Sequence, residues 1–340
     1  MIYPVAQIRN KTTAHTSTDP AVLKLAGDEL AISTVIRWAL DDEDYGEYLR
    51  QLLSLGDLYL EKGSDPRHLV KAVAIFQHVK NVQRNTFENP HIIASGVSGD
   101  ADVTEAANRG ILRAEQSLLS LLKADVAEGE RVFSPERQAY FRGKLEILRT
   151  AQSLGIDLSD EDGAEPFATE TACKDTTRTF KEILAEMNGD CERLMAGHME
   201  KPCKDALAGV GSLRTDSTTP YSDAEFVLLL ERDDVDKDYF RIRQLLLECM
   251  MIQMGETILP AAGIESLRGM YDNITVNGFA LDANLKTANK TPLGTSDTTD
   301  PAYRFDLMHS PAKMVELFQP KEMEAQIGDY HLATALSRVG

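Results

Sequence analysis

The chain has no CxxC pair and no group of histidines near a cysteine. Its four cysteines, among 340 residues, are spread between positions 173 and 249. Tetrahedral zinc sites need closely spaced thiolates and imidazoles, so we expect no zinc centre. Scattered cysteines of this kind are typical of reduced, partly buried thiols, and they favour a cytoplasmic protein.

Long apolar runs are also missing. No stretch approaches the roughly 18 apolar residues that a membrane span requires. Residues 1–20, MIYPVAQIRNKTTAHTSTDP, lack the charged and apolar regions of a signal peptide and predict a polar N-terminal arm. We therefore expect a soluble protein that does not engage a membrane.

Positive charge is scarce. The chain carries 36 Lys and Arg residues against 54 Asp and Glu, a formal net charge of -18. So acidic a surface repels the phosphate backbone of DNA or RNA, although a local basic patch is compatible with this balance. An extended nucleic-acid partner is therefore disfavoured. Hydrophobic residues at 43% supply enough apolar material for one or two cores, and the length favours two domains.

The pattern of the chain from 21 to 155 is helical, except over 90–104, where PHIIASGVSGDADVT breaks it. Apolar residues recur every three or four positions over 28–40, over 48–63, from 70 to 79 and over about 104–126. Ser134 followed by Pro135 predicts the start of another helix that reaches about residue 154. These patterns predict an all-α N-terminal domain over 21–155.

The first clear helix pair resembles a tetratricopeptide hairpin, in which small residues let two helices approach and large ones fill the gap. The residues that carry this likeness are Leu55, Gly56, Tyr59, Gly63, Ala72 and Phe76. The spacing from Gly63 to Ala72 is about four residues longer than in the repeat. An unrelated helical hairpin is the alternative. The resemblance implies a protein partner bound through helical repeats.

Beyond residue 155 the pattern changes. The acidic run over 156–175 predicts a linker, or else a long surface loop within one body. A helix is expected over about 176–199, strands at 206–211 and 224–231, a helix over about 236–254 and further strands within 269–285. The second strand is apolar enough to be buried on both faces. The fold class is therefore α+β, an all-α domain followed by a small mixed sheet flanked by helices over 176–325.

One constellation in this half indicates phosphate chemistry. Asp223 and Glu225 are separated by one residue at the start of a strand, so their side chains project from the same face. Paired carboxylates are the oxygen ligands that Mg²⁺ prefers. Gly211 and Ser212 are expected to form a turn where the backbone approaches phosphate oxygens. Arg214 can bind phosphate through its bidentate guanidinium, and a surface ion pair is the alternative for it.

GSLRTDSTTPYSDAE resembles the nucleotidyltransferase signature, in which Gly-Ser precedes an Asp-x-Asp/Glu pair. It is most similar to the group of PII-uridylyltransferase, glutamine-synthetase adenylyltransferase and their relatives, and eleven residues separate Gly211 from Asp223. The resemblance implies a polymerase-β-like fold, Mg²⁺ or Mn²⁺, and a nucleoside triphosphate such as ATP. This chain departs from that group in carrying Glu225 as the second acid.

That fold commonly adds a third carboxylate, which acts as base toward the incoming hydroxyl. The resemblance assigns this role to Asp282, with Asp272 as the runner-up; the alternative is that Asp282 is only a turn acid before a loop. Lys290 and Thr291 are candidates for nucleotide contacts, and a surface turn is the alternative for them. His309 precedes a Ser-Pro helix start and is expected to cap or pack. Residues 307–319 resemble that group's segment after the active site. Residues 326–340 are expected to form a C-terminal helix or the start of a region that this chain lacks.

Three functions remain open from the sequence. The first is an enzyme that moves AMP or UMP onto the hydroxyl of a protein or small molecule, since the acidic surface disfavours a polynucleotide acceptor. The second is a nucleotide-binding scaffold that has lost turnover, against which retention of all three acids argues. The third is a glycosyltransferase, which uses a similar acid pair but fits the upstream Gly-Ser turn poorly.

Overall fold

The computed structural model describes residues 20–88, 101–122, 124, 126–155, 166–267, 270, 274–275, 278–281, 291–293, 307–317 and 337–339. Residues 1–19 of the predicted N-terminal arm lie outside this set. Across the described ranges, no helix combines the length and apolarity that a bilayer crossing requires.

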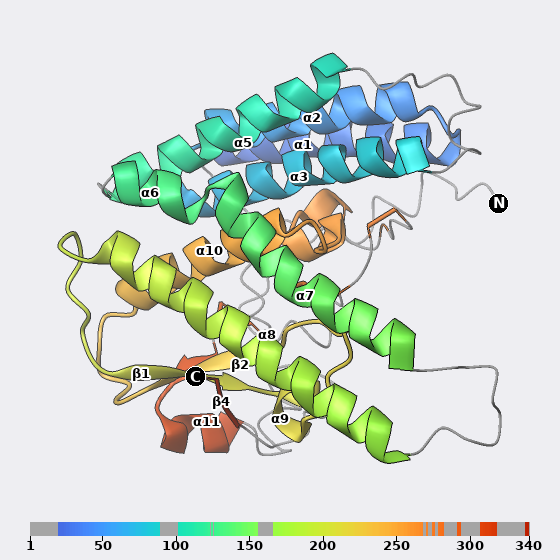
Figure 1. The fold of residues 1–340 in the computed structure, drawn as a ribbon. Helices are drawn as coiled ribbons and strands as arrows, with labels where there is room; N and C mark the ends of the chain where they lie inside the picture. Colours follow the sequence, from blue (N-terminus) through green and yellow to red (C-terminus); the bar gives the residue numbers. More distant parts are fainter. Residues whose placement is uncertain are drawn as a thin grey trace.

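Helices alone make up the described N-terminal half, as the periodicity predicts. They are α1 (Pro20–Asp41), α2 (Tyr45–Glu61), α3 (Pro66–Glu88), α5 (Ala101–Leu122), α6 (Val126–Val132) and α7 (Pro135–Gly155). The first four of these run side by side, and α7 descends from them toward the sheet (Figure 1). The predicted start of α7 is confirmed, because the Ser134 hydroxyl accepts a hydrogen bond from the Arg137 amide at 3.1 Å.

Close helix packing in this half depends on two glycines that face one phenylalanine. Phe76 of α3 is 1% exposed and lies between Gly56 of α2 and Gly110 of α5. A Cβ atom at Gly56 would lie 2.6 Å from the Phe76 ring, and one at Gly110 would lie 2.5 Å from it. Gly56 and Phe76, two of the residues that carry the tetratricopeptide resemblance, are therefore in close contact. A relation to tetratricopeptide repeats stays a prediction.

The second half combines helices with a small sheet. Its elements are α8 (Pro166–Met195), β1 (Asp205–Gly209), α9 (Gly211–Thr215), β2 (Phe226–Leu230), α10 (Asp238–Gln253), β3 (Met308–His309), α11 (Pro311–Leu317) and β4 (Ser337–Val339). The strand order is β3-β2-β1-β4; β1 pairs antiparallel with β2 and β4, while β2 pairs parallel with β3. The α+β class with a mixed sheet is thus confirmed.

Two expectations about this half are wrong in detail. Residues 166–175, predicted as linker, form the first turns of α8, because Pro166 suits a first helical turn and the polar residues after it are compatible with a helix. The predicted C-terminal helix is wrong at 337–339, where β4 pairs with β1. Strands of two or three residues such as β3 and β4 carry no readable periodicity, so the sequence does not reveal them.

The two halves share one core. Buried apolar residues of α3, α8, α10 and the sheet form one continuous cluster, and α10 lies between the helical array and the sheet (Figure 1). Arg243 of α10, only 2% exposed, donates to Glu192 of α8 at 2.7 Å and pairs with Asp205 of β1. Burial of this ion pair ties α10 to both neighbouring elements.

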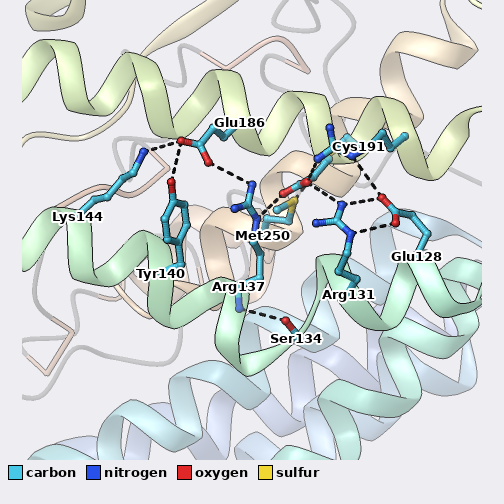
Figure 2. A network of polar contacts seen from close by, with 11 residues as sticks. Glu128, Arg131, Ser134, Arg137, Tyr140, Lys144, Glu186, Cys191 and Met250 are labelled. Atoms are coloured by element: carbon cyan, nitrogen blue, oxygen red, sulfur yellow. Dashed lines mark hydrogen bonds and ion pairs between the residues drawn. The ribbon is translucent and has the colours of Figure 1, made fainter.

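A second ion-pair network fastens α6 and α7 to α8. The carboxylate of Asp190 on α8 has no exposed surface and accepts from Arg131 at 3.0 Å, from Arg137 at 2.7 Å and from Arg193. Figure 2 shows its continuation, in which Glu186 accepts from Lys144 at 2.5 Å. Because this buried carboxylate shares several charge-assisted hydrogen bonds, it contributes more to the stability of the fold than an isolated surface ion pair does.

A buried carboxyl also lies where α5 meets the end of α10. Glu115 is 8% exposed and accepts a hydrogen bond from the Gln253 amide at 2.6 Å. Burial raises the pKa of Glu115 to about 7 from its ordinary 4.5, although Gln253 and Lys80 act in the opposite direction. The Glu115 carboxyl therefore holds its proton to a higher pH in the folded protein than in the unfolded chain.

Replacing Glu115 with glutamine should remove a pH-dependent loss of stability. Because the pKa of Glu115 is higher in the folded protein than in the unfolded chain, the protonated Glu115 stabilises the fold. This stabilisation is fully present below about pH 4.5 and is lost as the pH rises through about 7. At pH 8 the variant should be more stable than the parent by up to about 3 kcal/mol, because the pKa difference converts at about 1.4 kcal/mol per unit. Urea unfolding at pH 5 and pH 8 measures this. Glu105→Gln, at an exposed position of α5, is the control, and equal pH dependence in both variants would contradict the assignment.

Candidate functional site

The antiparallel pairing of β1 with β2 brings the predicted motif residues together. Gly209 lies opposite Phe226 in the register, and the Val210 amide donates to the Glu225 carbonyl at 3.0 Å. The Gly-Ser segment begins where β1 ends, and the acid pair ends where β2 begins. Segments eleven residues apart in the sequence therefore meet at one end of two paired strands.

Gly211 and Glu225 are in direct contact. Gly211 has φ +56°, and a Cβ atom there would lie 1.8 Å from Oε2 of Glu225. Glu225 is only 9% exposed, so its carboxylate is held against the glycine backbone. Both the backbone conformation and the available space require glycine at this position.

The backbone at the acid pair is held in place by Ala224, the residue between Asp223 and Glu225. Ala224 is fully buried, and its amide donates to the Ala280 carbonyl at 2.9 Å. Asp223 and Glu225 flank Ala224 just before β2 begins at Phe226. The alternation of side chains along an extended chain predicts that the two acids share a face. Asp223 is half-buried, and within the described residues its carboxylate has no hydrogen bond or ion pair.

The segment expected as a simple turn is the short helix α9. The Ser212 carbonyl accepts from the amides of Asp216 and Ser217, and the Ser212 hydroxyl accepts from Thr218 at 3.5 Å. Arg214 is half-buried; in the part of the chain that the structure describes, its Nε is buried and has no hydrogen-bond partner. An orphaned guanidinium nitrogen in so acidic a protein is an observation that an anionic ligand would explain.

The loop between the turn and the acids is held by hydroxyl groups. Thr218 is fully buried, and its amide donates to Thr177 Oγ1 on α8 at 3.3 Å. Farther along, the Thr219 amide donates to the Ser222 hydroxyl at 3.0 Å. The sequence shows these residues only as a polar stretch, so no signal marks their role before the fold is known.

Asp282, Asp272 and Lys290 lie outside the described residues. Thr291 is 3% exposed, beside Pro292, whose carbonyl accepts from the Leu307 amide at 2.9 Å; its nucleotide role stays a prediction. His309 ends β3, and its Nδ1 lies 3.2 Å from Asp233 Oδ1; its expected role as a capping or packing residue stays a prediction.

The donor set at the acid pair suits a hard cation. Both groups are carboxylates, and the glycine at 211 leaves room for the Glu225 carboxylate. Among the described residues, no three His, Cys, Asp or Glu side chains gather in a way that could hold a metal ion. Asp223 and Glu225 therefore offer a pair of ligands, to which a nucleotide's phosphate oxygens and a third acid would add.

A separate hollow of about 450 Å³ lies beside α9, against α8. Its lining residues are Lys174, Arg178, Lys181, Glu182, Ala185 and Asp216. Each cation is paired, with Lys174 2.5 Å from Glu170, Arg178 2.6 Å from Asp175 and Lys181 3.3 Å from Asp216. This hollow is therefore close to electrostatic balance and is a weaker anion site than the Gly-Ser segment.

Comparisons of the chain with protein-family models, with curated proteins and with solved structures found no match. The functional argument therefore depends on the residues of this chain and on their geometry.

Proposed function

We propose that the protein is a metal-dependent nucleotidyltransferase that moves AMP or UMP from a nucleoside triphosphate onto the hydroxyl of a protein or small molecule. The observation that carries this proposal is the contact between Gly211 and Glu225, beside Asp223. It joins a Gly-Ser segment to an acid pair at one end of β1 and β2, as the resemblance to the uridylyl- and adenylyltransferase group implies.

The proposed roles follow from the chemistry of each group. The acceptor's hydroxyl oxygen attacks the α-phosphorus and loses its proton, while the bond to the β-phosphate breaks and pyrophosphate leaves. Asp223 and Glu225 would hold Mg²⁺ or Mn²⁺, which neutralises phosphate charge when bound. Arg214 and the Gly211–Ser212 backbone bind phosphate oxygens. Asp282 remains the proposed base for the hydroxyl proton.

The helical half is proposed to recognise the acceptor or to brace the catalytic half. Its shared core with α10 and its ion pairs to α8 support the bracing role. The net charge of -18 supports a protein or small-molecule acceptor over a polynucleotide.

Nucleotide turnover by the pure protein tests this proposal. We expect pyrophosphate release or transfer of label from one of the four α-³²P-labelled nucleoside triphosphates. Chelation of divalent cations should abolish the signal, and added Mg²⁺ or Mn²⁺ should restore it. Nucleotide binding without product would favour the scaffold alternative, and turnover of a UDP-sugar alone would favour a glycosyltransferase. Absence of both binding and turnover would contradict the proposal.

A further inference from the structure

Arg149 of α7 reaches from the helical half to the loop that carries the acids. Its side chain is 13% exposed, and Nη2 donates to the Pro220 carbonyl at 3.1 Å. Its guanidinium carbon lies 5.1 Å from the centre of the Tyr221 ring. A cation of the N-terminal half thus contacts Pro220 and Tyr221, which lie just before Asp223 in the loop from the Gly-Ser segment.

The same nitrogen binds a second buried group. Arg149 Nη2 lies 2.7 Å from Oε2 of Glu256, which follows α10 and is 8% exposed. That oxygen also accepts from the Phe279 amide at 2.8 Å. A Cβ atom at Gly278 would lie 2.1 Å from Glu256 Oε2 and 2.6 Å from Arg149 Nη2, so glycine there makes room for the pair.

These contacts continue to the acid pair itself. Phe279 is followed by Ala280, whose carbonyl accepts from the Ala224 amide at 2.9 Å. Ala224 stands between Asp223 and Glu225. The Arg149–Glu256 pair therefore contacts both the loop before the acids and the 278–281 segment that is hydrogen-bonded to Ala224.

We propose that Arg149 is a positioning residue, which sets the geometry of Asp223 and Glu225 through Glu256 and the 278–281 segment. The catalytic part of this inference rests on the proposed function, because an effect of Arg149 on turnover requires that the protein be a nucleotidyltransferase. Arg149 contacts neither acid, so its substitution should act on the placement of the acids and not on nucleotide affinity.

Hydrogen exchange tests the positioning without reference to activity. Arg149→Met and Gly278→Ala should each raise the exchange rates of the Phe279 and Ala224 amides by about tenfold or more. Gly143→Ala, also on α7 but with nothing within 4 Å of the added Cβ, should leave both rates unchanged. Unchanged exchange at Ala224 in both test variants would overturn the inference.

Kinetics then separate positioning from mere stability. In an active enzyme, both variants should lose about 10- to 100-fold in kcat, because misplacement by about 1 Å can cost 10²-fold. The nucleotide dissociation constant should change less than about threefold. Wild-type kcat with a lowered melting temperature would show a structural role only and would overturn the inference. An inactive wild type with the expected exchange changes would contradict the proposed function and leave the positioning intact.

Discussion

Replacing Asp223 with alanine should abolish nucleotidyl transfer. Asp223 is half-buried beside Glu225 and has no hydrogen bond or ion pair among the described residues, so its loss removes little folding energy. Removal of one preorganised charged group from a site of this kind costs about 10²–10³-fold in kcat, and loss of a metal ligand should cost at least that much. Initial rates at saturating nucleotide and Mg²⁺ measure the effect.

Asp234→Ala is the matched control for that measurement. Asp234 lies shortly after β2, whereas Asp223 lies shortly before β2. The Asp234 side chain is 80% exposed. Wild-type kcat in this variant would show that the loss at Asp223 is specific. Equal kcat in Asp223→Ala and wild type would contradict the assignment of the acid pair.

Replacing Gly211 with alanine should lower activity by roughly 100-fold. The backbone at φ +56° disfavours alanine by about 1–2 kcal/mol. The added Cβ would also lie 1.8 Å from Glu225 Oε2, so the carboxylate has to move. Displacement of a site group by about 1 Å is enough for a loss of that size.

The control for Gly211 shares its backbone strain but not its contact. Gly197, in the turn after α8, has φ +82° and nothing within 4 Å of an added Cβ. Gly197→Ala should lower the melting temperature by less than Gly211→Ala, which adds the overlap with Glu225, and should keep full activity. Parallel losses of activity in both variants would mean that strain, and not the overlap with Glu225, causes the effect.

The sequence predicts those parts of the candidate site whose residues lie close together along the chain. The Gly-Ser segment, the acid pair and the apolar strand after it all fall within one short stretch. Strand alternation predicts which side chains share a face. The register of β1 with β2 then brings the Gly-Ser segment next to the acid pair. The helices of the N-terminal half follow from periodicity for the same reason.

Long-range contacts could not be predicted in this way. Arg149 and Glu256 are 107 positions apart, and neither stands in a motif. Asp190 looks like one of many surface acids in an acidic chain until α6 and α7 each place an arginine beside it, next to Arg193 of its own helix. Short elements such as α9 and β4 are set by their neighbours in space, which a local pattern does not contain.

The most direct test of the central claim is a crystal structure with Mn²⁺ and a non-hydrolysable analogue of whichever nucleotide binds. The account predicts an anomalous manganese peak bound by the carboxylates of Asp223 and Glu225, with the triphosphate against Gly211 and Ser212 and in contact with Arg214. A nucleotide bound elsewhere, or a bound nucleotide without manganese at these two acids, would contradict it.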